Sequence, residues 1–338
     1  MSRATRIVRS VFMLFMPVVV LLIAGFVGAS VWFVHSTAVP PHAQYLVTPE
    51  KYGRLSSRGA QVTDERWQNR DGTEARGWLL KGTPGYPAVI LLHRYGADRS
   101  HVLNLGVKLN EATDYTVLMP DQRGHGPSPL IAKTTFGGCE SEDVLAAIDY
   151  IKGLKTASKK PLIANSIGIY GVEMGGLAGL SASSKFTSVK AIALDSVPMS
   201  SDDVLALAVD EKFPFASSIT SELAKSGAYL YYANGCYERR TVCDMAQATE
   251  GREVLLLAGA DRPALRNSTS QLSGCFARTS KVTTFTDMNP SGLSLASAPL
   301  EQADAYEQRV IYFFKSILDE KENIDSDSSP KEDANTAK

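Results

Sequence analysis

Short apolar runs alternate with segments of helical period through most of the chain. Several runs are continuously apolar, as expected of strands that are covered on both faces of a sheet. This alternation predicts an α/β fold, a mainly parallel central sheet flanked by helices. The predicted strands are residues 61–67, 76–81, 88–93, 116–120, 167–172, 189–195, 253–258 and 281–286.

Helical spacing of apolar residues marks two long segments between and after these strands. One face of the first carries Val144, Ile148, Ile151 and Leu154, and one face of the last carries Tyr306, Val310, Phe313 and Ile317. We expect both faces to lie in the core. Residues 199–250 mix helical spacing with two cysteines, and we expect them to form a small helical cap at the C-terminal edge of the sheet.

The N-terminal segment differs from the rest, because an uncharged apolar run extends from Val11 to Val34 after Arg3, Arg6 and Arg9. The run is long enough to span a bilayer. A signal peptide cleaved after residues 27–29 is the alternative, but the run exceeds a usual signal core. We therefore predict an uncleaved transmembrane anchor.

The boundaries that follow are a cytoplasmic N-terminus at 1–9, the anchor at 10–35, a polar linker at 36–60, the folded domain at 61–319 and a disordered tail at 320–338. Arginines before the anchor favour a cytoplasmic N-terminus, which places the domain on the extracytoplasmic, periplasmic or extracellular, side. The formal net charge is −1. Without a basic stripe, the chain has no visible means of attracting nucleic-acid phosphates, and we expect no nucleic-acid partner.

Four cysteines fit an oxidising compartment. Cys236 and Cys243 are close in sequence and are the candidates for a small disulfide, which would contribute roughly 2–3 kcal/mol in the chain-entropy model. Cys139 and Cys275 are either a second bridge or two unpaired thiols. The chain has no CxxC pair, so we predict no metal site, and nothing in the sequence indicates a cofactor.

Four segments in a fixed order carry a resemblance to a known family. They are Leu-Leu-His-Arg-Tyr-Gly at 91–96, Pro-Asp-Gln-Arg-Gly-His-Gly-Pro-Ser at 120–128, Gly-Val-Glu-Met-Gly-Gly at 171–176 and Leu-Ala-Gly-Ala-Asp-Arg-Pro at 257–263. Together they resemble the α/β-hydrolase superfamily, in its serine esterase and S9–S33 peptidase-like branch, over about residues 60–318. The resemblance implies an α/β-hydrolase fold.

The resemblance also implies a catalytic triad, and this sequence departs from it. Glu173 stands where the nucleophilic serine of the G-x-S-x-G turn is expected. No histidine follows His125, and Ser291 lies near the position of the general base. Asp261 matches the acidic member. We infer a degenerate triad, because a carboxylate cannot form an ordinary acyl-enzyme and no imidazole can take the proton.

Arg94 occupies the glycine position of the family's oxyanion-hole motif, beside Tyr95. Our hypothesis is that the Glu173 carboxylate turns toward the backbone amide of Met174, pairs with Arg94 and fills the hole. The alternative has Glu173 in solvent and Arg94 along the surface. His93 and His125 belong to structural motifs of the family, and we expect them to hydrogen-bond to the backbone.

We therefore expect a membrane-anchored, catalytically inactive α/β-hydrolase-like protein, a pseudoenzyme, that binds a small ligand or a protein through its cap and cleft. An active esterase or peptidase-like hydrolase with a displaced nucleophile at Ser166, Ser196 or Ser291 is the alternative. Carboxylate-nucleophile chemistry by Glu173 with Asp261 as base ranks below both, because it lacks the histidine that such enzymes use.

Overall fold

A single eight-stranded sheet forms the centre of the computed structural model, which describes residues 3–42, 44–52, 61–215 and 217–327. The strand order is β1-β2-β4-β3-β5-β6-β7-β8. Every predicted strand is present, with ends that shift by a few residues. The strands are β1 (Val62–Gln68), β2 (Glu74–Leu80), β3 (Tyr86–Leu92), β4 (Thr116–Pro120), β5 (Ile163–Val172), β6 (Val189–Asp195), β7 (Glu253–Gly259) and β8 (Lys281–Met288).

The sheet is mainly parallel, as the alternating pattern predicts. β2 pairs with β1 and β4 in antiparallel fashion, and all pairs from β4 through β8 are parallel. Strands β3 and β6 are buried over almost their whole length, because helices cover both faces. The carboxyl ends of the parallel strands therefore meet at one edge, where loops can bring distant residues together.

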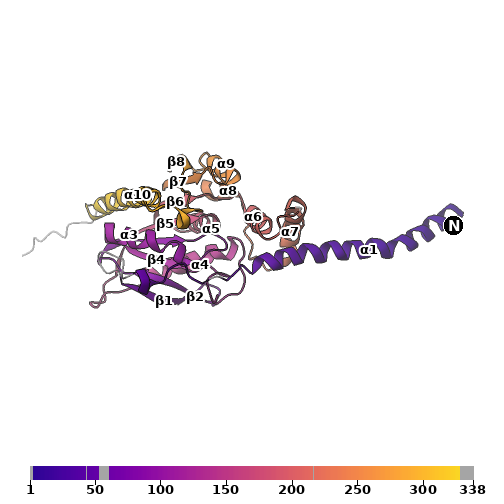
Figure 1. The fold of residues 1–338 in the computed structure, drawn as a ribbon, viewed down its shortest axis with the longest axis horizontal. Helices are drawn as coiled ribbons and strands as arrows, with labels where there is room; N and C mark the ends of the chain where they lie inside the picture. The colour runs from indigo at the N-terminus through magenta and orange to yellow at the C-terminus, as the bar shows by residue number, and fades with distance from the viewer. Residues whose placement is uncertain (1–2, 43, 53–60, 216, 328–338) are drawn as a thin grey trace, which may run out of the picture.

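Helices lie on both faces of the sheet (Figure 1). One face packs against α3 (Leu103–Thr113) and α10 (Leu300–Asp327), and the other against α4 (Gly138–Gly153) and α5 (Met174–Ser183). Helix α9 (Pro263–Leu272) packs beside β7 and β8. Short helices α2 (Pro49–Tyr52), η1 (Arg99–His101) and η2 (Leu295–Ser297) occur in the connections.

The predicted helix faces lie largely in the core. Val144, Ile148, Ile151, Tyr306 and Val310 are buried. Phe313 and Ile317 are only half-buried, and their neighbours Phe314 and Leu318 are fully buried instead. An α-helix has about 3.6 residues per turn, so Phe314 and Leu318 lie about 100° around the helix from Phe313 and Ile317. The buried face is therefore rotated from the predicted stripe, and at the last turns Phe314 and Leu318 face the core instead.

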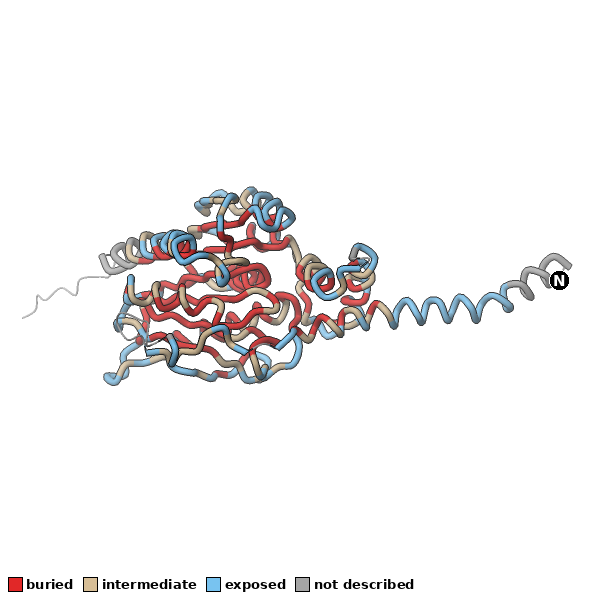
Figure 2. Tube along the Cα trace, viewed as in Figure 1, coloured by how far each residue is buried: buried red, intermediate tan, exposed pale blue. Residues whose placement is uncertain are grey.

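Helix α1 (Arg3–Ala38) extends away from the domain with its apolar surface exposed (Figures 1 and 2). Its segment Phe12–Ala38 contains an 18-residue stretch with a mean hydropathy of 2.6 and is long and apolar enough to cross a membrane, a property that fits an anchor or a signal sequence. The last turns pack on the domain, where Val34 and Ala38 are buried. The helix thus continues three residues into the predicted linker.

The segment between β6 and β7 contributes three helices, α6 (Ser201–Lys212), α7 (Ser217–Tyr231) and α8 (Val242–Gln247). Helices α6 and α7 lie beside the end of α1 where it meets the domain (Figure 1). A Cβ on Gly227 would clash with the backbone oxygen of Ser30, so glycine allows α7 to approach α1 closely. The cap segment therefore joins the apolar helix to the sheet.

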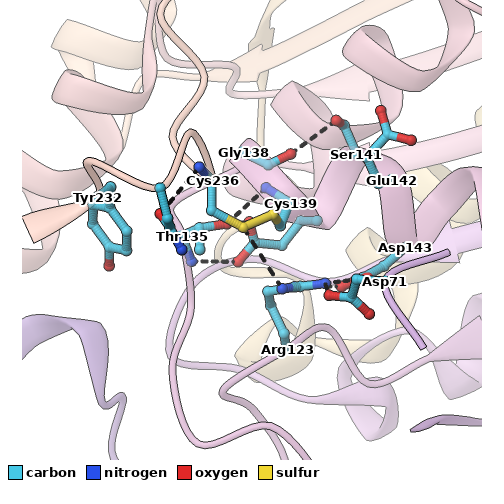
Figure 3. Close-up of a disulfide and its surroundings, with 12 residues drawn as sticks. Asp71, Arg123, Thr135, Gly138, Cys139, Ser141, Glu142, Asp143, Tyr232 and Cys236 are labelled. Atoms are coloured by element: carbon cyan, nitrogen blue, oxygen red, sulfur yellow. Dashed lines mark hydrogen bonds and ion pairs between the residues drawn. A yellow bond between two sulfur atoms is a disulfide. The ribbon is translucent and has the colours of Figure 1, made fainter. Parts of the chain in front are cut away.

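The predicted pairing of Cys236 with Cys243 is wrong. Cys236 is bonded to Cys139 at the start of α4 (Figure 3), and Cys243 is bonded to Cys275 just after α9. The Cα–Cα distances are 5.2 Å and 4.9 Å. Nearness in sequence misled the prediction, because Cys243 begins a helix that faces α9 and the preceding loop carries Cys236 toward α4. Both bridges join the cap segment to the core.

Two further segments bear on the predicted boundaries. In the predicted linker, Tyr45 packs on Trp78 with ring centroids 4.9 Å apart and donates a hydrogen bond of 3.1 Å to Asp121. Helix α10 continues to Asp327, so the first part of the predicted disordered tail is helical. The rest of that tail lies outside the described residues.

Candidate functional site

Glu173 lies at the sharp turn between β5 and α5. Its backbone dihedrals are φ 51° and ψ −112°, a region that side chains other than glycine rarely adopt. A Cβ on Gly171 would lie 2.5 Å from the carbonyl oxygen of Gly175, and a Cβ on Gly175 would lie 2.5 Å from that of His93. Both glycines are therefore required for the strand, the turn and the helix to meet.

The Glu173 side chain turns inward and is only 7% exposed. Its Oε2 accepts a hydrogen bond of 3.1 Å from the backbone amide of Tyr95. The expected ion pair with Arg94 is not formed, because the Arg94 guanidinium donates instead to the Tyr95 carbonyl oxygen at 2.9 Å. Within the described residues, the Met174 amide is not a partner of this carboxylate either. The amide of Tyr95 takes the place predicted for that of Met174.

Burial decides the protonation of this carboxyl group. Desolvation raises the pKa of Glu173 from 4.5 to about 7, against the opposing effects of Arg94 and the Tyr95 amide. Glu211 raises the pKa further and Arg262 lowers it. The group therefore changes its charge near neutral pH, at a turn whose backbone is fixed.

Asp261 and Ser291 meet beside this turn. Asp261 follows β7 and Ser291 follows β8, and the Ser291 hydroxyl donates a hydrogen bond of 2.8 Å to Asp261 Oδ2. A Cβ on Gly259 would lie 2.8 Å from the Ser291 Cβ, so glycine lets the two loops close together. The serine thus stands against the carboxylate where a triad would hold its imidazole.

Comparison with known proteins identifies the architecture. No protein-family model matches the chain, and no curated protein sequence matches it either. Among solved structures, the esterase Pf2001 of Pyrococcus furiosus superposes with a TM-score of 0.59 at 20% identity, over 82% of this chain and 97% of the esterase. The chain has the α/β-hydrolase fold.

Two other solved structures agree. The α/β hydrolase GrgF from a Penicillium species gives a TM-score of 0.56 at 14% identity, over 77% of this chain and 99% of GrgF. A dienelactone hydrolase from Anabaena variabilis gives 0.50 at 13% identity, over 77% of this chain and 99% of that chain. Identities this low describe the shared α/β-hydrolase fold and not a shared reaction.

Both histidines near the site are committed to backbone contacts, as expected from their place in this fold. His93 Nδ1 lies 2.8 Å from the Arg94 carbonyl oxygen, and its Nε2 accepts from the Gln122 amide at 3.1 Å. His125 makes the same two kinds of contact, with the Arg123 carbonyl and the Gly96 amide. Burial lowers the pKa of His93 to about 4 and that of His125 to about 3, so both rings are neutral.

The serines proposed as displaced nucleophiles lie in the interior. Ser166, Ser196 and Ser291 are all buried. The Ser196 hydroxyl donates to its neighbour Asp195 at 2.6 Å, and that of Ser291 donates to Asp261. In the part of the chain that the structure describes, no hydrogen bond joins a serine hydroxyl to an imidazole.

Asp195 is a site residue that the sequence analysis missed. It ends β6, is fully buried, and accepts hydrogen bonds from the Gly292 amide at 2.9 Å and the Tyr306 hydroxyl at 2.8 Å. Desolvation raises its pKa to about 6. Its contact with Gly292 fixes the loop that presents Ser291. A carboxylate directly after the apolar run Ala191–Leu194 was the signal that could have found it.

Tyr95 connects the site to the apolar helix. Its amide holds Glu173, and its buried hydroxyl donates a hydrogen bond of 2.7 Å to the Thr37 carbonyl oxygen at the end of α1. The ring lies between His125 and Phe136, with centroid distances of 5.6 Å and 5.9 Å. A single residue, Tyr95, therefore links the end of α1 to the Glu173 carboxylate.

A cleft of about 420 Å³ opens above Glu173 between α6 and the loops after β7 and β8. A second hollow of about 410 Å³ continues between α6 and α9 and shares Leu207, Asp210 and Leu265 with the first. No group of three or more His, Cys, Asp or Glu residues is placed to hold a metal ion in the described residues. The cleft is lined by Arg94, Glu173, Leu207, Asp210, Glu211, Asp261, Arg262, Leu265, Leu293, Ser294 and Ser297.

Proposed function

We propose that this protein is a membrane-anchored, non-hydrolytic member of the α/β-hydrolase fold that binds a small ligand in the cleft beneath α6. One observation carries the proposal: a carboxylate of the protein itself occupies the nucleophile turn and accepts the Tyr95 amide. In hydrolases of this fold such an amide is free to stabilise the oxyanion of the transition state. Here the donor is already used.

The remaining triad positions support the same conclusion. Acyl transfer needs a hydroxyl or thiol nucleophile and a base that takes its proton. Ser291 cannot act as that base, because a neutral hydroxyl oxygen is far too weak a base near neutral pH, and the Ser291 hydroxyl already donates to Asp261. His93 and His125 are held by backbone groups on both ring nitrogens.

The cleft supports a binding role. Its volume of about 420 Å³ falls within the range of small-molecule sites. Leucines supply apolar surface. Arg262 supplies a positive charge, and the carboxylates of Asp210 and Glu211 supply negative charges. A ligand with both an apolar part and a polar or charged group fits this lining best.

The anchor gives the proposal a location. Arginines before the apolar segment of α1 favour a cytoplasmic N-terminus and a domain on the other side of the membrane. Two disulfides agree with an oxidising compartment. We therefore place the cleft outside the cytoplasm, close to the membrane.

Covalent labelling tests the absence of hydrolysis. We expect the purified full-length protein to remain unlabelled by a fluorophosphonate probe and to leave p-nitrophenyl acetate unhydrolysed. The double variant Glu173→Ser/Ser291→His supplies the two missing groups beside Asp261, and its labelling would show that the site had been accessible. Saturable ester cleavage by the wild-type protein, lost in Ser291→Ala or Ser196→Ala, would refute the proposal.

A cleft-filling substitution tests the binding role. Leu207→Trp places an indole into the cleft from α6, and Leu130→Trp is the matched change on an exposed loop outside it. Small molecules extracted from each protein after purification from membranes are compared by mass spectrometry. We expect at least one species that Leu130→Trp retains and Leu207→Trp loses. Identical extracts, or a co-purifying protein lost in Leu207→Trp, would contradict small-ligand binding.

A further inference from the structure

Helix α7 and the turn before it expose an unusual amount of apolar side chain. Phe215 in the turn is 89% exposed, and Ile219 and Leu230 on the helix are 65% and 58% exposed. Ile219, Leu223 and Leu230 recur at helical spacing and share one face, on which Leu223 is half-buried between the two exposed residues. We call Phe215 and these three residues the α7 stripe. Soluble domains seldom leave such a stripe uncovered.

The stripe faces the same region as the apolar half of α1. Gly227 of α7 abuts Ser30 of α1, and Tyr231 of α7 lies 2.9 Å from the His35 ring nitrogen through its hydroxyl. Two such contacts in the same order mean that α7 runs in the same direction as α1. Ile219 precedes Gly227 by about two turns, so it lies on the side of Gly227 toward the N-terminal, apolar part of α1.

Aromatic residues mark the level at which the two elements meet. The Phe213 ring contacts Trp32 and Phe33 of α1, with centroid distances of 5.5 Å and 5.2 Å. Lys212 donates to the Ser36 carbonyl oxygen one turn further on. Tryptophan and lysine are the residues that membrane proteins place at the boundary between lipid and water.

The length of α1 agrees with that boundary. Its apolar segment of 27 residues is about 40 Å long, whereas the hydrocarbon core needs only about 30 Å. The segment is therefore longer than the hydrocarbon core requires. Its excess residues lie at the C-terminal end, where α1 packs on α6 and α7 from Ser30 onward. The bilayer surface then falls near Trp32, with the N-terminal part of the α7 stripe on its lipid side and Leu230 close to its level.

We propose that the α7 stripe inserts into the headgroup and upper acyl region of the same bilayer that α1 crosses. The proposal rests on α1 being retained as an anchor. Glu222 and Lys225 form an ion pair of 2.9 Å on α7, and Glu222 is 72% exposed. Such a pair belongs at the interface rather than in hydrocarbon, so insertion is shallow, as in interfacial helices.

The bilayer is a better occupant than a second copy of the chain. Beside the stripe, residues 12–28 of α1 are exposed on all sides and would have to be covered by lipid. Any second protein that covered the stripe would therefore also stand in the bilayer next to α1. Lipid covers both surfaces continuously.

Depth-dependent quenching tests the insertion in the full-length protein. All four native cysteines are paired, so a single new cysteine accepts an NBD label without reduction. The label is placed at Phe215→Cys or Ile219→Cys, and at Tyr312→Cys as control, in nanodiscs with or without lipid that carries a doxyl group on the upper acyl chain. Tyr312 is 75% exposed on α10, a helix that lies on the side of the domain away from α1 (Figure 1).

We expect the doxyl lipid to lower the fluorescence at both stripe positions at least about twofold and to leave the Tyr312→Cys label unchanged. Iodide should quench the control label and spare the stripe labels. Stripe labels that escape the doxyl group and respond to iodide would overturn the proposal while leaving the anchor intact. Spontaneous disulfide dimers of unlabelled Phe215→Cys in discs with two copies would overturn it in favour of a second chain.

Discussion

At the scale of single residues, Glu173 combines two costs in one place. Its backbone has a positive φ, and its carboxyl group is removed from water. The Tyr95 amide and the charge of Arg94 offset part of the second cost, but desolvation still prevails and raises the pKa. A residue that destabilises the fold through both its backbone conformation and its buried carboxyl group is expected where function, rather than stability, selects it.

The raised pKa predicts a pH-dependent cost. Below pH 4.5 the carboxyl is protonated in both states, and above about pH 7 it is ionised in both. Between these values the folded chain binds the extra proton, so stability falls as pH rises. Glu173→Gln removes the cost of ionising this buried carboxyl group. At pH 8 we expect the substitution to raise the free energy of unfolding by on the order of 3 kcal/mol, and the unfolding temperature with it, and at pH 4.5 we expect little effect.

Thermal unfolding in detergent, followed by tryptophan fluorescence, measures this difference. Glu301→Gln is the matched control, because Glu301 is an exposed residue on α10. It should leave the unfolding temperature unchanged at both pH values. An equal effect of Glu173→Gln at pH 4.5 and pH 8 would mean that the carboxyl is not desolvated.

At the scale of elements, the approach of β5, α5 and β3 depends on the absence of side chains. A Cβ on Gly175 would lie 2.5 Å from the His93 oxygen and 2.8 Å from that of Leu92. Gly175→Ala must therefore move backbone, and we expect a loss of about 2–4 kcal/mol in the free energy of unfolding.

Gly153→Ala is the matched control, because a Cβ there meets nothing within 4 Å at the end of α4. Its effect should stay within about 1 kcal/mol, with either sign. Urea denaturation of the two variants in the same detergent compares them. If Gly175→Ala is no more destabilising than Gly153→Ala, then the turn is looser than these contacts require.

The elements themselves could be predicted because each is encoded locally. Strand β3 is apolar from Pro87 to Leu92, and strands that are covered on both faces tend to have that composition. The turn at Glu173 was recognisable from Gly171 and Gly175, since their spacing reflects steric need. These features require no knowledge of what lies across the sheet.

The rest of the site depends on tertiary placement. The Gly292 amide binds Asp195 across a sequence separation of 97 residues, and no local pattern connects them. Asp210 of α6 reaches the cleft only because the cap folds back over the sheet. The direction of the Arg94 side chain could not be predicted either. The Tyr95 carbonyl oxygen and the Glu173 carboxylate compete for the same guanidinium, and the carbonyl oxygen is the partner observed.

At the scale of the whole molecule, the two disulfides fasten the cap segment at its C-terminal side and leave α6 and α7 to be held by packing on α1 and on the core. Cys139–Cys236 closes a loop of 97 residues and Cys243–Cys275 one of 32. In the chain-entropy model these closures contribute about 4–5 and about 3–4 kcal/mol. The part of the cap nearest α1 is thus held by non-covalent packing rather than by a disulfide.

This arrangement predicts which peptides stay linked when the protein is isolated from membranes, alkylated without reduction and digested with trypsin. Cleavage after Arg239 and Arg240 separates Cys236 from Cys243, so each bridge yields its own pair of peptides. We expect Cys139 linked to Cys236, and Cys243 linked to Cys275. Cys236→Ser should free the Cys139 thiol, leave the other bridge intact and lower the free energy of unfolding by about 4 kcal/mol.

The same experiment tests the compartment, because disulfides of this kind persist outside the reducing cytoplasm. Cys243→Ser is the matched control: it should free Cys275 and retain the link between Cys139 and Cys236, with a smaller loss because the loop is shorter. A peptide that joins Cys236 to Cys243 would refute the pairing. Four alkylated thiols in freshly isolated wild-type protein would instead place the domain in the cytoplasm, against the orientation that Arg3, Arg6 and Arg9 favour.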